Sequence, residues 1–181
     1  MSEQRLVYLD NNATTRVAPE VVEAMLPCLT EHWGNPSSAY SLAAEPARLI
    51  EEARERVAWL IGANSRNIVF TSCGTESNNA ALQGATLANL AKRHIVTTAV
   101  EHSANIKFCR QLEKRGYEVT HLPVDLCDLQ AAIRPDTAIV SIMWANNETG
   151  VLFPIEEIAA ICRSHGVLFH TDAVQVAGKV P

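Results

Sequence analysis

The amino-acid sequence predicts an α/β fold in which helices cover both faces of a mostly parallel β-sheet. From residue 67 onward, short apolar runs typical of strands alternate with longer stretches of helical periodicity, and their lengths suit β–α–β units. Hydrophobic residues make up 48% of the 181 positions, which is enough to bury one substantial core. No internal repeat and no linker-like stretch divides the chain.

The first third of the chain is predicted to be helical. Pro19 opens an amphipathic helix, because proline is tolerated in a first turn, and Pro27 is expected to bend or end it. A second helix is predicted over about residues 41–61, where apolar side chains share one face and charged side chains the other. Pro46 either lies in the first turn of this helix or kinks it, and Gly62 suits its C-terminal cap.

Strands and helices then alternate to the end of the chain. The strands are predicted over residues 67–70, 94–98, 117–122, 137–143 and 167–170. The helices are predicted over residues 76–90, 104–114, 128–133 and 155–165, and two of them are expected to end at Gly116 and Gly166.

Charge and cysteine spacing argue against several classes of protein. A net charge of −5 disfavours nucleic acid or an anionic membrane as the main partner. No apolar run approaches the roughly 18 residues that span a bilayer, and residues 1–6 lack the features of a secretory signal. The five cysteines lie far apart, without disulfide or zinc spacing, so we expect a cytoplasmic protein without a metal site.

Ligands of open α/β sheets bind beyond the carboxyl ends of the strands, so the residues that follow each predicted strand are candidates for a site. Residues 71–78 form a turn of small, hydroxyl-bearing residues that leads into a helix, which predicts a cup of N–H groups for a phosphate. Plain N-capping by Ser72 or Thr75 is the alternative. The turn lacks the lysine of a nucleoside-triphosphate-binding loop.

The other predicted strands end in polar side chains as well. Asp172 follows a buried-type strand, where a carboxylate requires a cationic partner such as a protonated heteroaromatic nitrogen, or else caps the next turn. His102 could stack on a flat ligand and move protons, or be merely structural. Asn147 could donate to a phenolate or carboxylate, or satisfy turn backbone. With the phosphate cup and Gln175, they point to one flat, phosphorylated, protonated ligand: pyridoxal phosphate.

Six motifs resemble those of the cysteine desulfurases and occur in the same order. They are Leu9–Thr15, Gly34–Ser38, Phe70–Ser77, Val100–His102, Ala145–Gly150 and His170–Gln175. The likeness runs from about Val7 to Pro181 and is strongest to the nitrogenase-associated branch. It implies the large domain of a pyridoxal-phosphate enzyme of fold type I, related to the class-V aminotransferases.

The resemblance implies how the cofactor is held. Gly74 and Thr75 would bind its phosphate, and His102 would stack on its ring and act as the catalytic acid or base. Asp172 would pair with the pyridinium nitrogen, and Gln175 would hydrogen-bond the phenolate oxygen.

Asn147 would contact the oxygen side of the ring and the substrate carboxylate. In the family, sulfur from L-cysteine passes to an enzyme cysteine as a persulfide, which leaves L-alanine, and then to an iron–sulfur scaffold protein. The resemblance therefore implies a cytoplasmic homodimer that serves iron–sulfur cluster assembly or nitrogen fixation. Residues 1–16 would belong to the small domain and residues 17–181 to an incomplete large domain.

The family's Schiff-base lysine, persulfide cysteine and carboxylate-binding arginine have no match here, so we expect an N-terminal fragment that is inactive alone. Lys179 stands where the family has a non-catalytic residue, and Cys73 is expected to line the phosphate cup rather than act as a nucleophile. Two alternatives stay open: a non-catalytic truncated product that binds phosphate or a partner, and another fold-type-I enzyme such as a selenocysteine lyase or an aminotransferase. Residues 144–150 favour the desulfurase.

Overall fold

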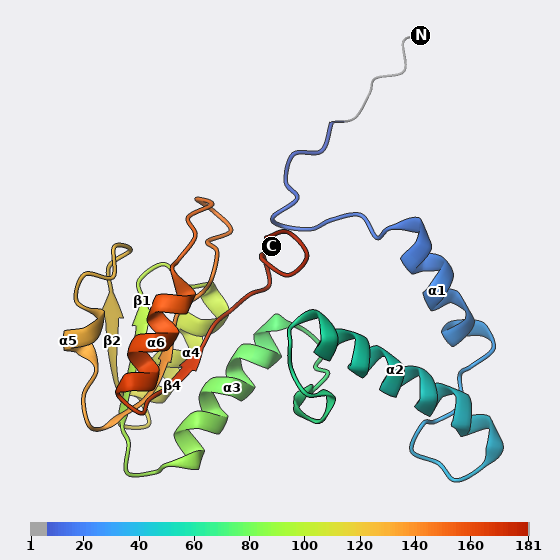
Figure 1. Ribbon diagram of the computed structural model, residues 1–181, viewed down its shortest axis with the longest axis horizontal. Helices are drawn as coiled ribbons and strands as arrows, with labels where there is room; N and C mark the ends of the chain where they lie inside the picture. Colours follow the sequence, from blue (N-terminus) through green and yellow to red (C-terminus); the bar gives the residue numbers. More distant parts are fainter. Residues whose placement is uncertain (1–6, 181) are drawn as a thin grey trace. The chain divides into compact units, whose positions relative to one another are not determined.

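The computed structural model describes residues 7–180 and divides them after Phe70 into two units, residues 7–70 and residues 71–180 (Figure 1). The domain boundary that the resemblance places after residue 16 stays a prediction, and residues 1–6 of that segment lie outside the described residues. Within the described part of the segment, the Tyr8 hydroxyl donates to the carbonyls of Asp10 and Thr14 at 2.8 and 3.2 Å, which closes a polar turn.

The N-terminal unit is helical, as predicted. It contains α1 (Pro19–Thr30), η1 (Ser41–Ala43), α2 (Ala44–Leu60) and η2 (Ser65–Asn67). Pro46 lies in the first turn of α2, and Gly62 follows that helix at a φ of +64°, the left-handed conformation that favours glycine. The prediction that Pro27 bends or ends α1 is wrong for the end: the helix continues to Thr30, because the N–H of Glu31 still donates to the Pro27 carbonyl at 2.8 Å.

The predicted strand over residues 67–70 is also wrong. Ile68 has an extended backbone, with φ −87° and ψ +126°, but no strand pairs with it among the described residues. The guanidinium group of Arg54 contacts this segment instead. It donates to the Ile68 carbonyl at 2.5 Å and lies 4.9 Å from the ring centre of Phe70. Apolar β-branched residues favour extended backbone, but a strand also requires a neighbour to receive its hydrogen bonds.

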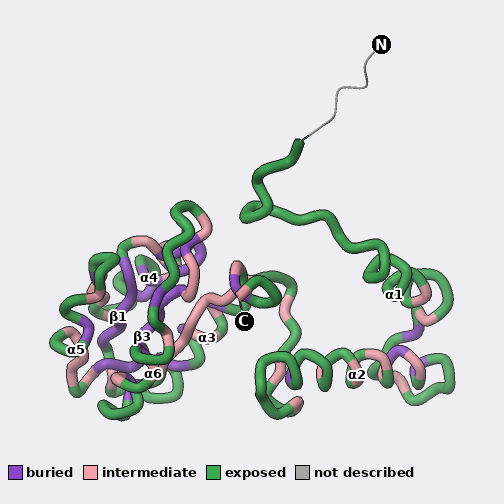
Figure 2. Tube along the Cα trace, turned by 45° about the horizontal axis from the view of Figure 1, so that its top comes forward, coloured by how far each residue is buried: buried purple, intermediate pink, exposed green. Residues whose placement is uncertain are grey.

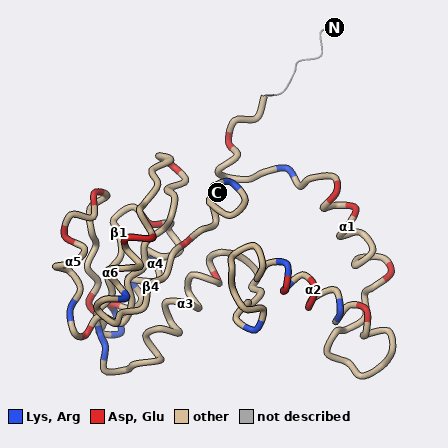
Figure 3. Tube along the Cα trace, in the orientation of Figure 1, with Lys and Arg blue, Asp and Glu red and all other residues tan. Residues whose placement is uncertain are grey.

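Charged side chains of both signs alternate along α2 (Figure 3). Arg48 pairs with Glu45 and Glu52, at 2.6 and 2.9 Å, and Arg56 also pairs with Glu52. Exposed pairs of this kind contribute little to stability, so the charges mark the solvent face of the helix. Among the described residues, no helix is long and apolar enough to cross a bilayer.

The C-terminal unit is built on four parallel strands, which confirms the predicted sheet. They are β1 (His94–Thr98), β2 (Glu118–Leu122), β3 (Thr137–Ser141) and β4 (Leu168–His170), in the order β2-β1-β3-β4. The two central strands, β1 and β3, are buried along their whole length (Figure 2). This burial is expected of the central strands of a parallel sheet that is covered on both faces, although both strands also carry buried polar residues.

Helices cover both faces of this sheet, also as predicted. They are α3 (Gly74–Ala88), α4 (Ser103–Glu113), α5 (Leu129–Ala132) and α6 (Ile155–Ser164). Neighbouring residues of β1 face opposite clusters: Ile95 packs with the α3 and α4 side chains, and Val96 with those of α5 and α6. Each face of the sheet therefore has its own apolar core.

The direction of the chain reverses between the two central strands. From β1 the chain crosses to β2 on one side, and it then returns to β3 and β4 on the other side. Crossovers in opposite directions place α4 and α6 on opposite faces of the sheet. The loops that follow β1 and β3 therefore flank a topological switch point, which is where open α/β sheets bind ligands.

Candidate functional site

The segments that follow β3 and β4 stay side by side beyond the sheet. The Ile142 N–H donates to the His170 carbonyl at 3.1 Å, and the Trp144 N–H donates to the Asp172 carbonyl at 2.9 Å. These bonds extend the pairing past the assigned strands and bring the chain around Asp172 against the loop that carries Asn147. Two of the predicted site segments are therefore joined by backbone hydrogen bonds.

Glu101 joins the segment after β1 to the segment after β3. Its carboxylate is 5% exposed, and one oxygen accepts hydrogen bonds from the Thr98 hydroxyl at 2.7 Å and the Met143 N–H at 2.9 Å. The other oxygen accepts from the Asn105 amide at 3.1 Å. Burial raises the pKa of Glu101, and these three donors act in the opposite direction. Sequence reasoning did not single out this residue, although an acidic residue soon after a buried strand was the available signal.

His102 is the N-cap of α4. Its Nδ1 accepts a hydrogen bond from the Ala104 N–H at 3.2 Å, so Nδ1 carries no proton in this arrangement. Nε2 is then the nitrogen that bears the proton and can exchange it with a ligand. The side chain is exposed, next to the buried Glu101 that ties this loop to β3.

The two adjacent asparagines differ in role. Asn146 is 6% exposed; its amide donates to the Val100 carbonyl at 3.0 Å, and its carbonyl oxygen accepts from the N–H groups of Glu148 and Thr149 at 3.0 and 2.9 Å. It thus holds the loop together and ties it to the segment before His102. Asn147 is half-buried and donates to the Glu148 carboxylate at 3.2 Å. The alternative role, in which an asparagine side chain hydrogen-bonds the backbone of the turn, is therefore filled by Asn146, which the sequence analysis did not single out.

The carboxylate of Asp172 is held at both oxygens. Oδ1 accepts from the Val174 N–H at 3.0 Å, and Oδ2 accepts from the side-chain amide of Asn78 at 2.7 Å. Beside it, the buried hydroxyl of Thr171 has no hydrogen-bond partner among the described residues. Gln175 follows in the same turn and accepts from the Lys179 ammonium group at 2.7 Å.

The first turn of α3 begins at Gly74 and Thr75. Cys73 is the N-cap, so neither Ser72 nor Thr75 occupies that position, and the Ser72 N–H and hydroxyl donate instead to the Glu76 carboxylate at 2.7 and 2.6 Å. The pKa of the Cys73 thiol lies below its usual value, chiefly because the N–H of Glu76 points at the sulfur and secondarily because of the Ser72 hydroxyl. The N–H groups at the start of a helix favour anions, and in this turn the Glu76 carboxylate already accepts from the Ser72 N–H at 2.7 Å.

Gly74 brings this turn against the Asp172 segment. A Cβ atom added to Gly74 would lie 3.0 Å from a methyl carbon of Val174, so a larger residue would require the Val174 side chain to give way slightly. The first turn of α3 therefore lies against the segment that carries the fixed carboxylate of Asp172 and the unpartnered buried hydroxyl of Thr171. This set of groups suits a ligand that carries both a phosphate and a cationic aromatic ring.

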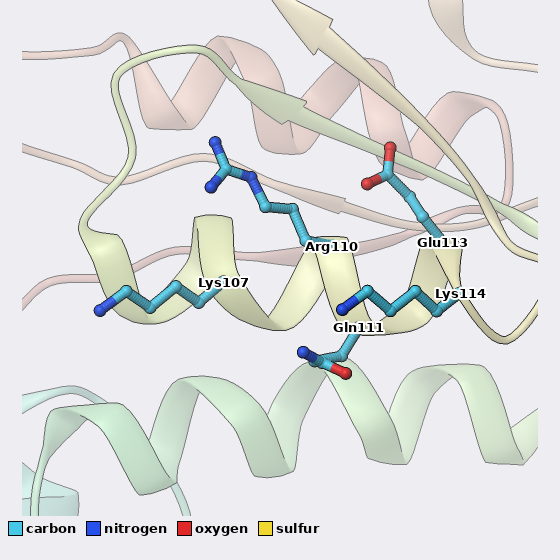
Figure 4. A pocket seen from close by; sticks show the side chains of 5 residues that line it. All are labelled: Lys107, Arg110, Gln111, Glu113 and Lys114. Carbon is cyan, nitrogen blue, oxygen red and sulfur yellow. The ribbon is translucent and has the colours of Figure 1, made fainter.

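A separate hollow of about 740 Å³ lies along the outer side of α4 (Figure 4). Lys107, Arg110, Gln111, Glu113 and Lys114 line it. In Figure 4, Gln111 points toward α3, while Arg110 and Glu113 lie on the other side of the helix. None of the predicted site residues lines this hollow, and its charges are exposed and of both signs.

Comparison with protein families identifies the chain. Residues 7–181 match the model of the class-V aminotransferases. The chain belongs to this family. Among curated relatives, cysteine desulfurase 2 of Trichormus variabilis is 55% identical over 97% of this chain and 46% of its own length. The cysteine desulfurase NifS of Azotobacter vinelandii is 50% identical over 97% of this chain and 45% of its own.

Solved structures confirm the fold. A NifS-like protein superposes with a TM-score of 0.93 at 41% identity, over 97% of this chain and 50% of that one. A structure described as SspA in complex with cysteine superposes with a TM-score of 0.89 at 38% identity, over 93% of this chain and 51% of that one. The described residues thus have fold type I, and the chain spans about half the length of the relatives it matches.

Proposed function

We propose that these residues form the cofactor-holding part of a pyridoxal-phosphate-dependent cysteine desulfurase. The observation that carries the proposal is the fixed carboxylate of Asp172 beside the first turn of α3, where Gly74 approaches Val174. A phosphate and a cationic ring on one ligand would meet both features at once. The names of the relatives support the desulfurase over a selenocysteine lyase or another aminotransferase.

Each residue that holds the cofactor has a distinct task. The N–H groups of Gly74 and Thr75 bind the phosphate at the positive end of α3. Asp172 holds the proton on the ring nitrogen, and Gln175 hydrogen-bonds the phenolate oxygen. When bound, pyridoxal phosphate supplies an electron sink for bonds broken at the substrate carbon.

His102 and Asn147 act on the substrate side. Nε2 of His102 moves a proton, because Nδ1 is held by the Ala104 N–H. Asn147 orients the carboxylate of L-cysteine, and Asn146 holds the loop that positions it. On the family resemblance, we extend the proposal to a cytoplasmic homodimer that delivers sulfur to an iron–sulfur scaffold protein, in cluster assembly or nitrogen fixation. Cysteine desulfurases named NifS and IscS are among the relatives.

Binding of pyridoxal phosphate to the 181-residue chain tests the proposal, measured by equilibrium dialysis. We expect Asp172→Ala to weaken binding about tenfold or more, because it removes the partner of the ring nitrogen. Glu157→Ala, which removes an exposed carboxylate from α6, is the control for the change in charge and should leave binding unchanged.

Two outcomes would contradict the proposal. Equal binding of pyridoxal phosphate by the wild type and Asp172→Ala would remove the role of this carboxylate. Inorganic phosphate binding as tightly as pyridoxal phosphate would favour the alternative, a non-catalytic phosphate-binding product. We expect this chain alone to form no alanine from L-cysteine.

A further inference from the structure

Asn78 is a buried amide to which the proposed mechanism assigns no task. It lies on α3, four residues after Gly74, and is 4% exposed. A buried amide is costly unless it is hydrogen-bonded, and this one donates to Oδ2 of Asp172 at 2.7 Å. The bond joins the first helix of this unit to the segment that follows its last strand.

We propose that Asn78 is a positioning residue that fixes the carboxylate of Asp172 for a cationic ring. This inference rests on the proposed function, because it takes Asp172 as the partner of the ring nitrogen. The other donor, the Val174 N–H, belongs to the same short turn as Asp172 and moves with it. Asn78 is therefore the donor that holds the carboxylate relative to the rest of the fold.

The same helix holds the phosphate turn. Four residues of α-helix rise about 6 Å, so α3 places Asn78 at a set distance behind the N–H groups of its first turn. Because Gly74 has no side chain, the first turn of this helix can approach the Val174 side chain closely. Asn78 thereby links the position of the carboxylate to that of the phosphate turn.

A neutral donor such as the Asn78 amide suits the negative charge around Asp172. The buried carboxylate of Glu101 lies close enough to Asp172 for the two charges to repel, which adds to the rise in the pKa of Glu101. A hydrogen bond from Asn78 stabilises the carboxylate without changing the net charge available to a cationic ring.

The test compares two ligands that differ only at the ring nitrogen: pyridoxal phosphate and its analogue with a C–H group in that position. Affinities are measured for the wild-type chain, Asn78→Leu, and Gln83→Ala as a control on an exposed position of α3. We expect the wild type and the control to prefer pyridoxal phosphate by about tenfold or more, and Asn78→Leu to lose most of this preference.

Asn78→Asp provides a second readout that a purely structural role would not produce. At neutral pH the introduced carboxylate repels Asp172, and the preference for pyridoxal phosphate should be lost. At lower pH the introduced group takes up a proton and donates to Asp172 again, so the preference should return. This variant keeps the size of the side chain, and it serves if Asn78→Leu fails to fold.

The outcomes separate this inference from the function on which it rests. If both ligands bind more weakly to Asn78→Leu while their ratio stays that of the wild type, Asn78 is structural only and the inference is overturned. The same holds if the preference of Asn78→Asp is independent of pH. If the wild type binds neither ligand, or both equally, the proposed function itself is wrong.

Discussion

Replacing Asn146 by alanine should destabilise the C-terminal unit, whereas the same change at Asn147 should not. Asn146→Ala removes the donor to the Val100 carbonyl and the acceptor of the Glu148 and Thr149 N–H groups. Each bond is worth about 1 kcal/mol net, and Glu148 and Thr149 are exposed enough for water to replace part of the loss. We therefore expect a loss of about 2 kcal/mol in the free energy of unfolding.

Urea unfolding of the two variants measures this difference, and amide hydrogen exchange locates it. Exchange at Glu148 and Thr149 should accelerate in Asn146→Ala, because these N–H groups lose their acceptor. Asn147→Ala should stay within about 0.5 kcal/mol of the wild type, since its side chain is only half-buried and donates to the exposed Glu148, but should bind pyridoxal phosphate less tightly. Equal destabilisation by both changes would refute the division of roles between the two asparagines.

Three further predictions concern the core, the buried acid and the lysine near the end of the chain. Leu82→Ala should lower the free energy of unfolding by about 2–5 kcal/mol, because Leu82 is fully buried and packs with Ile95 and Cys109; thermal denaturation measures this. Glu101 binds its proton more tightly in the folded chain, so its contribution to stability is fully present below its ordinary pKa of 4.5 and is lost as pH rises from there through its higher pKa in the folded chain; the difference in unfolding free energy between the wild type and Glu101→Gln should follow this window. After dialysis, the chain mixed with pyridoxal phosphate should show no absorbance band at about 400–420 nm, and a persistent band abolished by Lys179→Ala would contradict our assignment of Lys179 as non-catalytic.

The periodicity of the sequence was sufficient to predict most of the fold. Helical spacing located α2, α4 and α6 to within a few residues, because each buries one apolar face and ends near a residue that stops a helix. The strand over residues 67–70 failed because pairing depends on a neighbour that the local sequence does not specify. The prediction that the helix ends at Pro27 failed because the missing N–H of proline removes one backbone hydrogen bond and leaves the next turn intact.

At the site, residues that follow strands were recognisable, while the residues that support them were not. Asp172 and His102 stand within a few residues of strand ends, so the topology brings them to one edge. Asn78 lies inside a helix, and its bond to Asp172 joins residues that are distant in sequence; no local pattern predicts it. The sequence could not distinguish Asn146 from Asn147, because both carry the same side chain and differ only in how far they are buried.

The exposed apolar side chains of α1 have a consequence for how the chain is degraded. None of its twelve residues, all described, is buried, and Val21, Met25 and Leu29 expose between 47% and 73% of their surface. A helix of this length has marginal stability without tertiary contacts, so it opens often compared with β1 and β3. A protease that cleaves at apolar residues should therefore cut within α1 first and leave the sheet intact, so limited digestion would yield the C-terminal unit as the resistant product.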